Sequence, residues 1–433
     1  MPAAGERRRC ERLRIECHGA GQKRFQFRYA VTANSSPGPF KRDTWSPNHE
    51  LLRLSPPPTT DVLRTVSSLA SILRIEEPGR SILSFGSFFR EIPRRMEQSP
   101  VLAAAAKALT HSASTYYAKA PTTPAVEHYG RALETLRVDV ACASEKTQFV
   151  NIICAIGILC LASNLMEFHR VDYEVHVRGL LSLLNRMPDT KLTTCFEKEG
   201  VAVAWSLVIG ECIMDPSIEI DPGLGERHRR RHGSIPTGPA ALTTESNTLR
   251  WENLMLLPRH LQDPVLYYPE LAATYKEMLL EGPRLVSTAK QHSQAATTSA
   301  KREVSFRCIL AETGCVELLS MSLVLNKTLQ ILDSSNSALT TQCTMLILEV
   351  IGAIYRLDRF KPLGTARLPN AMCLAWVTAP TPELKAIMRT ILDDHILDFR
   401  GVTWEELAAR YERRFRGIRA RVNSSRQDLR LLE

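Results

Sequence analysis

The sequence has little that would place the chain among secreted or small disulfide-bonded proteins. Residues 1–20 are basic and contain no apolar core segment, so we expect no signal peptide. The 11 cysteines show no spacing typical of a disulfide framework, and most stand within apolar runs. This pattern favours reduced, buried thiols in a cytosolic or nuclear compartment. With 433 residues, 44% hydrophobic and 23% charged, the chain can form one large soluble domain or two smaller ones.

Motifs of the common enzyme classes are also missing. The sequence has no P-loop, no glycine-rich dinucleotide turn after a strand, no His-Glu-x-x-His and no Gly-x-Ser-x-Gly. His128 and His176 have no partner spaced for metal binding or nucleophile activation, so we expect both to be structural or exposed. These absences predict a protein that is not an enzyme. A helix-lined pocket assembled from distant polar residues remains the alternative.

One long uncharged segment raises the question of a membrane span. Residues 149–166 contain 18 consecutive positions without a charge, which is at the threshold for a spanning helix. Asn151, Ser163 and Asn164 interrupt the segment, and no basic cluster closely flanks it. We therefore expect a helix buried at the centre of a large α-helical domain, and no membrane insertion.

The periodicity beyond residue 60 is helical, and no alternating strand pattern is present, which predicts an all-α fold. Ser99-Pro100 and Thr123-Pro124 place a capping side chain before a proline, and Thr403 with Glu406 forms a capping box. The predicted helices cover residues 61–76, 101–117, 124–142, 145–168, 171–187, 196–213, 265–281, 304–332, 337–357, 382–398 and a final helix from 404.

Two polar stretches are expected to interrupt these helices. Residues 215–250 are rich in Pro, Gly, Ser and Thr, and they include the basic run Arg227–His232. That run is typical of a solvated loop, and a nuclear-localisation or polyanion-binding patch is the alternative. Ser287–Ala300 is interpreted as a loop or a frayed helix.

Positive charge is concentrated at the two ends of the sequence. The net charge is +9, and residues 1–30 and 410–433 each contribute +5, which leaves the body nearly neutral. Basic ends attract polyanions such as nucleic acid, although solvated tails often have the same composition. Residues 31–60 contain Pro37, Pro39, Pro47 and the run Pro56-Pro57-Pro58, and this composition is typical of a linker with polyproline character.

The basic N-terminal segment carries the most informative motif. Six residues, two of them arginines, separate Cys10 from Cys17. A Gly-x-Gly-x-Lys motif that ends at Lys23 follows. This segment resembles the end of the fungal binuclear zinc cluster, in which six cysteines hold two zinc ions and a short helix enters the DNA major groove. The resemblance implies that Cys10 and Cys17 correspond to the fifth and sixth zinc-ligating cysteines. The basic residues that would contact DNA phosphates are Arg7, Arg8, Arg9, Arg12, Arg14 and Lys23.

The cluster is expected to be incomplete in this sequence. Arg7 occupies the position of the family's fourth cysteine, and the first half of the module, with its recognition helix, has no counterpart. Two thiolates cannot supply the four ligands of a closed zinc site, and without metal such a module lacks folding energy. We therefore expect no zinc bound by this chain and a mostly disordered segment over residues 1–58. A missing upstream exon or a true loss of the module would both explain the departure.

The helical body is similar to the fungal-specific transcription factor domain that follows the cluster in many of these proteins. The similarity extends over about residues 60–420. Three stretches carry it, and they occur in the family's order: His128–Leu136, His176–Leu184 and Met372–Thr378. Residues 1–30 are thus interpreted as a remnant of the DNA-binding module, 31–60 as the linker, and 61–425 as the regulatory domain.

The resemblance implies a nuclear regulator of transcription by RNA polymerase II, in a class often tied to metabolite gene clusters. Its expected partners are DNA, weakly unless the cluster is complete, and a second copy or another transcription regulator. Two alternatives remain from other classes. One is an α-helical enzyme or ligand-binding protein with an incidental basic N-terminus. The other is a peripheral membrane protein that uses the arginine-rich C-terminal helix, in which Trp404, Tyr411 and Phe415 form an apolar stripe.

Overall fold

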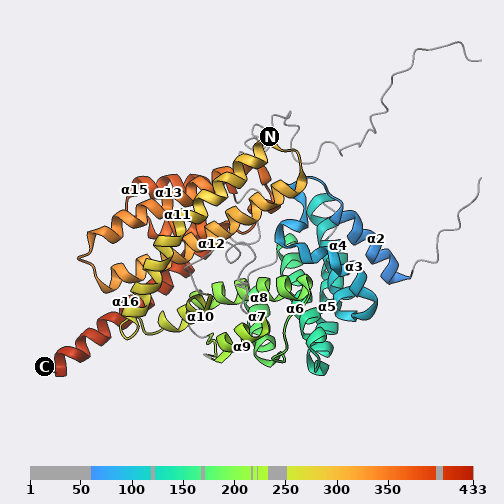
Figure 1. The fold of residues 1–433 in the computed structure, drawn as a ribbon, viewed down its shortest axis with the longest axis horizontal. Helices are drawn as coiled ribbons and strands as arrows, with labels where there is room; N and C mark the ends of the chain where they lie inside the picture. The colour runs from blue at the N-terminus through green and yellow to red at the C-terminus, as the bar shows by residue number, and fades with distance from the viewer. Residues whose placement is uncertain are drawn as a thin grey trace, which may run out of the picture. The chain divides into compact units, whose positions relative to one another are not determined.

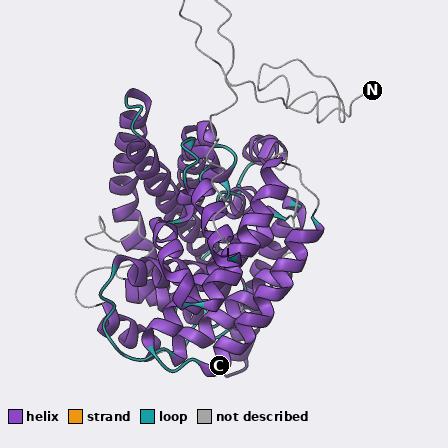
Figure 2. Cartoon of the chain, turned by 90° about the vertical axis from the view of Figure 1, so that its right-hand side faces the viewer, coloured by secondary structure: helices purple, strands orange, loops and turns teal. Residues whose placement is uncertain are grey.

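The computed structural model describes residues 60–118, 122–166, 171–215, 218–221, 223–232, 251–395 and 403–432, and residues Asp61–Glu433 form one compact unit. The described residues form helices and no strand, which confirms the all-α prediction (Figures 1 and 2). The α-helices are α2 (Asp61–Leu73), α3 (Ile92–Arg95), α4 (Pro100–Ala118), α5 (Thr123–Cys142), α6 (Lys146–Leu165), α7 (Val171–Arg186), α8 (Cys195–Met214), α9 (Gly223–His232), α10 (Trp251–His260), α11 (Tyr268–Thr298), α12 (Arg302–Leu332), α13 (Ser337–Leu357), α14 (Pro369–Thr378), α15 (Pro382–His395) and α16 (Trp404–Leu432).

Helices α4, α5, α7 and α8 gather around α6, and α2 and α3 contact α4, in the blue-to-green part of Figure 1. Helix α6 is apolar on all sides and contacts α4, α5, α7 and α8, so nearly every side chain from Phe149 to Leu165 is buried. Glu145 and Gln148 form a reciprocal capping box that fixes its first turn. The prediction that residues 149–166 lie at the centre of the domain is confirmed for this helix.

Helix α12 is the corresponding centre of the C-terminal half, where it contacts α11, α13, α14 and α16. Two buried polar groups on α12 have partners on neighbouring helices. The Asn326 amide donates to the Tyr275 hydroxyl at 2.7 Å and to the Leu339 carbonyl at 2.9 Å, and the fully buried Glu312 carboxylate pairs with Arg356 at 2.5 Å. Satisfied polar contacts of this kind fix the register of helices that apolar packing alone would leave free to slide.

Three helices among the described residues are long and apolar enough to cross a membrane by length and composition alone. Burial inside the domain covers 83% of the apolar window in α6 and 78% of that in α12, but only 44% of the window over Ser337–Phe360. The composition of the first two helices is therefore accounted for by packing. In α13, Met345, Leu348 and Tyr355 remain exposed along one face.

The predicted start of α16 is confirmed, whereas the predicted start of α5 is off by one residue. Thr403 caps α16, where its hydroxyl accepts from the Glu406 amide at 3.4 Å. The prediction that Thr123 caps α5 is wrong, because the helix already includes Thr123 and the preceding Thr122 makes no side-chain cap. Proline is tolerated at the first or second helical position because its missing N–H would have no partner there, so the proline marks the helix start within one residue only.

Two predictions of loops were also wrong. Ser287–Thr298 continues α11 as helix. Residues 78–98, for which no prediction was made, form a series of short 3-10 turns around α3. Within the stretch 215–250, residues Gly223–His232 form α9. In these segments tertiary packing overrides weak local propensity.

The basic run Arg227–His232 lies on α9, so the prediction of a loop is wrong there, and two of its arginines are held by the domain. Arg231 is 1% exposed, and its guanidinium donates to the carbonyls of Leu184 and Met187 at the end of α7 and pairs with Asp189 at 3.0 Å. Arg227 pairs with Asp221 at 2.6 Å. These arginines therefore fasten α9 to α7, because cations suit the carbonyl end of a helix.

The apolar stripe of α16 packs into the domain. Trp404, Tyr411 and Phe415 are all buried, and Ile418 and Val422 extend the same face. These side chains are covered by protein in this structure, whereas an interfacial helix would leave them exposed to the membrane.

We expect Arg231→Met to lower the free energy of unfolding by about 2–4 kcal/mol, because it leaves buried carbonyls and Asp189 without their cation. Arg230→Met is the matched control, since Arg230 is 57% exposed and pairs with the same aspartate at 3.1 Å. The control should change stability by less than about 1 kcal/mol. Urea denaturation of both variants measures the difference, and equal losses would contradict the assigned role.

Candidate functional site

The candidate functional site is a cavity of about 390 Å³ between the two groups of helices. Its walls come from α6 and α8 on one side and from α12, α14 and α16 on the other, with the 3-10 turns near Phe85 and Phe88 closing one part. Aliphatic and aromatic side chains form most of the wall, and a few polar groups interrupt them. This is the usual composition of a site for a small organic molecule.

Three buried helices each turn one face toward this cavity. Most of the lining positions follow the spacing of neighbours on a helix surface, three or four residues apart. Positions with this spacing are Gly157, Cys160, Leu161 and Asn164 on α6; Val203, Ser206, Leu207, Gly210 and Met214 on α8; and Glu317, Ser320, Met321 and Val324 on α12. Ser163, Leu165, Ile209, Glu211, Ile213 and Val316 of the same helices also line the cavity. These positions include several small or polar residues, namely Gly157, Asn164, Ser206, Gly210, Glu317 and Ser320.

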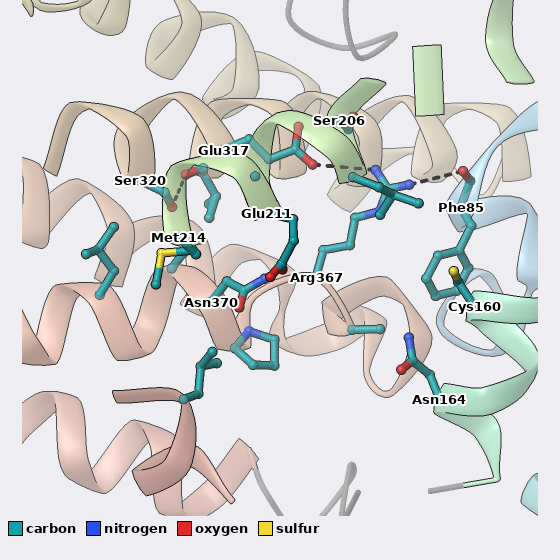
Figure 3. A pocket seen from close by; sticks show the side chains of 18 of the residues that line it. Phe85, Cys160, Asn164, Ser206, Glu211, Met214, Glu317, Ser320, Arg367 and Asn370 are labelled. Atoms are coloured by element: carbon teal, nitrogen blue, oxygen red, sulfur yellow. Dashed lines mark hydrogen bonds and ion pairs between the residues drawn. The ribbon is translucent and has the colours of Figure 1, made fainter. Parts of the chain in front are cut away.

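An ion pair lies at the wall where α12 faces the segment before α14. The Arg367 guanidinium is 3.6 Å from the Glu317 carboxylate and donates to the Phe85 carbonyl at 3.2 Å (Figure 3). The distance to Glu317 is longer than that of a direct charge-assisted hydrogen bond. The pair therefore leaves hydrogen-bonding capacity on both groups for a ligand.

Protein surrounds Glu317, although about a quarter of its side chain (24%) is open to the cavity. Burial raises the pKa of this carboxyl, and the nearby Arg367 offsets part of the increase. A carboxyl in such surroundings exchanges hydrogen bonds with a polar ligand more readily than one in water, because its solvation is already incomplete.

A second ion pair lies where α8 meets α16. The Glu211 carboxylate, only 3% exposed, is held by both terminal nitrogens of Arg410. Glu211 and Tyr411 line the cavity, so this pair closes the α16 side of the wall.

Two nucleophile-type side chains at the wall, Cys160 and Ser320, are not activated. Burial raises the pKa of the Cys160 thiol to about 12, so the thiol is protonated at neutral pH and unreactive. The Ser320 hydroxyl donates to the Val316 carbonyl of its own helix at 2.7 Å. The wall is thus suited to holding a ligand by apolar contact and hydrogen bonds.

The residues predicted to ligate zinc or to contact DNA lie outside the described part of the chain: Cys10, Cys17, Arg7, Arg8, Arg9, Arg12, Arg14 and Lys23. Within the described ranges, no group of three or more His, Cys, Asp or Glu side chains is placed to hold a metal ion. The prediction of disorder over residues 1–58 falls outside those ranges too.

The two singled-out histidines occupy structural positions. His176 on α7 is buried and shares a hydrogen bond of 2.7 Å between its Nε2 and the Tyr129 hydroxyl on α5. His128 stacks on His111 of α4, with 4.2 Å between ring centroids, and burial lowers the pKa of both rings. On α7, Gly179 does not serve close helix contact, because no atom lies within 4 Å of where its Cβ would be.

Comparison with known proteins returned no matching family model, no matching curated protein and no matching solved structure.

Sequence reasoning missed the cavity, although a signal for it was present. Gly157, Ser206, Gly210 and Ser320 are small or polar residues at helical spacing within helices that are otherwise strongly apolar. In a fully packed helix such positions would carry larger apolar side chains, so their clustering marks a face that is not closed by packing.

We expect Gly210→Ala to raise the free energy of unfolding by about 0.5–1 kcal/mol, because alanine favours the helix and a Cβ at this position meets open space. Gly157→Ala on α6 should behave in the same way.

Gly200→Ala is the control on the same helix as Gly210. A Cβ at Gly200 would overlap the Cys154 sulfur in the core, so we expect a loss of about 1–3 kcal/mol. Chemical denaturation of the three variants checks the cavity, and a loss of stability in Gly210→Ala would show that the space beside it is filled.

Proposed function

We propose that this chain is a nuclear regulator of RNA polymerase II transcription, of the fungal zinc-cluster type, and that its helical domain binds a small effector in the cavity between the two groups of helices. The observation that carries the effector proposal is the cavity itself, with one face of α6, α8 and α12 turned toward it and the Glu317–Arg367 pair at its wall. A metabolite with an apolar body and one acidic or hydrogen-bonding end fits these walls. Such an effector would suit control of a metabolite gene cluster.

The transcription part of the proposal is supported by the sequence resemblance. The Cys10–Cys17 segment and the three ordered stretches are its basis. The first two of those stretches lie on α5 and α7, and the Tyr129–His176 hydrogen bond joins them across the domain. The third stretch forms much of α14, where Leu374 lines the cavity. A second copy of the chain, or another regulator, is the proposed protein partner, and zinc is the proposed metal of a complete cluster.

The competing function is an enzyme that works in the same cavity. The observation in its favour is Glu317, a carboxyl with a raised pKa beside a cation in a largely apolar cavity, which is a frequent property of catalytic acids and bases. The protonated Cys160 and the hydroxyl of Ser320, which donates to its own helix, give this function no ready nucleophile. We therefore favour binding over catalysis.

DNA binding by this chain should be weak, non-specific and nearly lost at physiological salt. Arg8, Arg9 and Arg12 can contact phosphates, but phosphate contacts carry no sequence information and weaken steeply with salt. A version extended upstream by a segment with four more cysteines should bind one site specifically and in a zinc-dependent manner. A mobility-shift comparison measures both proteins, and discrimination of one site by the shorter chain would contradict the proposed role of Cys10 and Cys17.

The cavity should bind one equivalent of 8-anilinonaphthalene-1-sulfonate, an amphipathic aromatic anion, with an increase in its fluorescence. Gly210→Leu fills the space and Arg367→Gln removes the cation, so each should weaken binding by about tenfold or more, equivalent to about 1.4 kcal/mol. Gly130→Leu is the control, since Gly130 lies on α5 outside the cavity and also faces open space. Thermal melting confirms that each variant is folded, and unchanged binding in both cavity variants would refute the site.

A further inference from the structure

A second pocket, of about 300 Å³, lies along one face of α16 near the end of α8. Its lining positions on α16 recur every three or four residues, so a single helix face supplies most of the pocket. The residues are Met214, Asp215, Arg410, Arg413, Arg414, Gly417 and Arg421.

The acidic groups near this pocket are already committed to other partners. Asp215, the one acidic residue of its lining, pairs with Arg178 at 2.6 Å, and Arg410 is paired with the buried Glu211. Arg413, Arg414 and Arg421 thus bring more positive charge to the pocket than its lining carboxylate can balance.

Arg414 is the most constrained of these arginines, at 5% exposed. Its Nε donates to the Ile213 carbonyl at 3.0 Å, and its Nη2 donates to the Leu261 carbonyl at 3.1 Å. Through these two hydrogen bonds to neutral carbonyls, Arg414 joins the ends of α8 and α10 and thus has a structural role. Its Nη1, however, is buried and has no hydrogen-bond partner among the described residues.

Neutral acceptors also hold Arg421, which donates to the Gln262 carbonyl at 2.8 Å and the Gly417 carbonyl at 3.4 Å. Burial and the neighbouring charge of Arg421 lower the pKa of Arg414 to about 10, so the Arg414 guanidinium is still cationic at neutral pH. Asp215 is the one carboxylate of the lining that offsets these charges, and it also pairs with Arg178. Like charges held close together are costly, and an anion placed between them would relieve that cost.

We propose that this pocket is a binding site for a small molecule that carries a phosphate or pyrophosphate group. The guanidinium group presents donors in a planar fork that matches phosphate oxygens, and several cations favour a multivalent anion over a monovalent one. The pocket is distinct from the proposed effector cavity, although the Glu211–Arg410 pair reaches from the wall of one to the wall of the other.

Titration calorimetry of the full chain with inorganic pyrophosphate, at matched ionic strength, tests the site. We expect binding of one equivalent, weakened by about tenfold or more in Arg413→Gln and in Arg421→Gln. Arg416→Gln is the matched control, because Arg416 is an exposed arginine of the same helix that does not line the pocket. The control should bind as the unaltered chain does. Thermal melting confirms that the variants are folded, and Arg414 is left intact because of its structural contacts.

Two outcomes would overturn the proposal. One is an absence of pyrophosphate binding by the unaltered, folded chain. The other is an equal loss of pyrophosphate affinity in Arg413→Gln and in Arg416→Gln, together with displacement of pyrophosphate by short duplex DNA. That result would indicate a general attraction of polyanions to the positive charge of the whole helix. Neither outcome bears on the effector cavity, since Arg413 and Arg421 do not line it.

Discussion

The fold depends on the need to cover two central helices, α6 and α12, most of whose side chains are buried. Helix α6 has no polar face, and α12 carries buried side chains through most of its length. Each therefore requires neighbours all round, and each fully buried Leu, Ile or Phe contributes about 1.5–3 kcal/mol to the folded state. The surrounding helices satisfy this need almost everywhere. Where α6 and α8 face α12 and α14, the covering is incomplete, and the cavity occupies that place.

Many of the hydrogen bonds and ion pairs between helices are made by arginines. These polar contacts add to the apolar packing, which alone does not fix the positions of the helix ends. Arg231 binds the carbonyl end of α7, Arg414 joins the ends of α8 and α10, and Arg410 pairs with Glu211. In each case a guanidinium with several donors satisfies carbonyls or a carboxylate that would otherwise be buried without partners. The positive charge of the sequence is thus partly internal, and the net charge of +9 overstates what is available to a polyanion.

The sequence was sufficient to predict the all-α fold, the central burial of α6 and the capped start of α16, because these follow from local composition and capping. It was insufficient for α9, since a run of arginines and histidines has no apolar face and its helix depends on Asp189 and on the end of α7. The cavity was missed because its wall combines positions far apart in the chain, such as Gly157 and Arg367. The spacing of residues along a single sequence does not predict that such distant positions lie close together in the fold.

The position of the Glu211–Arg410 pair has a consequence for any ligand of either pocket. Glu211 lines the cavity between the helix groups, and Arg410 lines the arginine pocket, so the two walls share one interaction. A phosphate group that draws Arg410 toward itself weakens the pairing of a carboxylate that is only 3% exposed, and an underpaired buried carboxylate is costly. If a ligand of one pocket changes this pair, the affinity of the other pocket for its own ligand changes with it. Thermodynamic linkage requires that coupling to be equal in both directions.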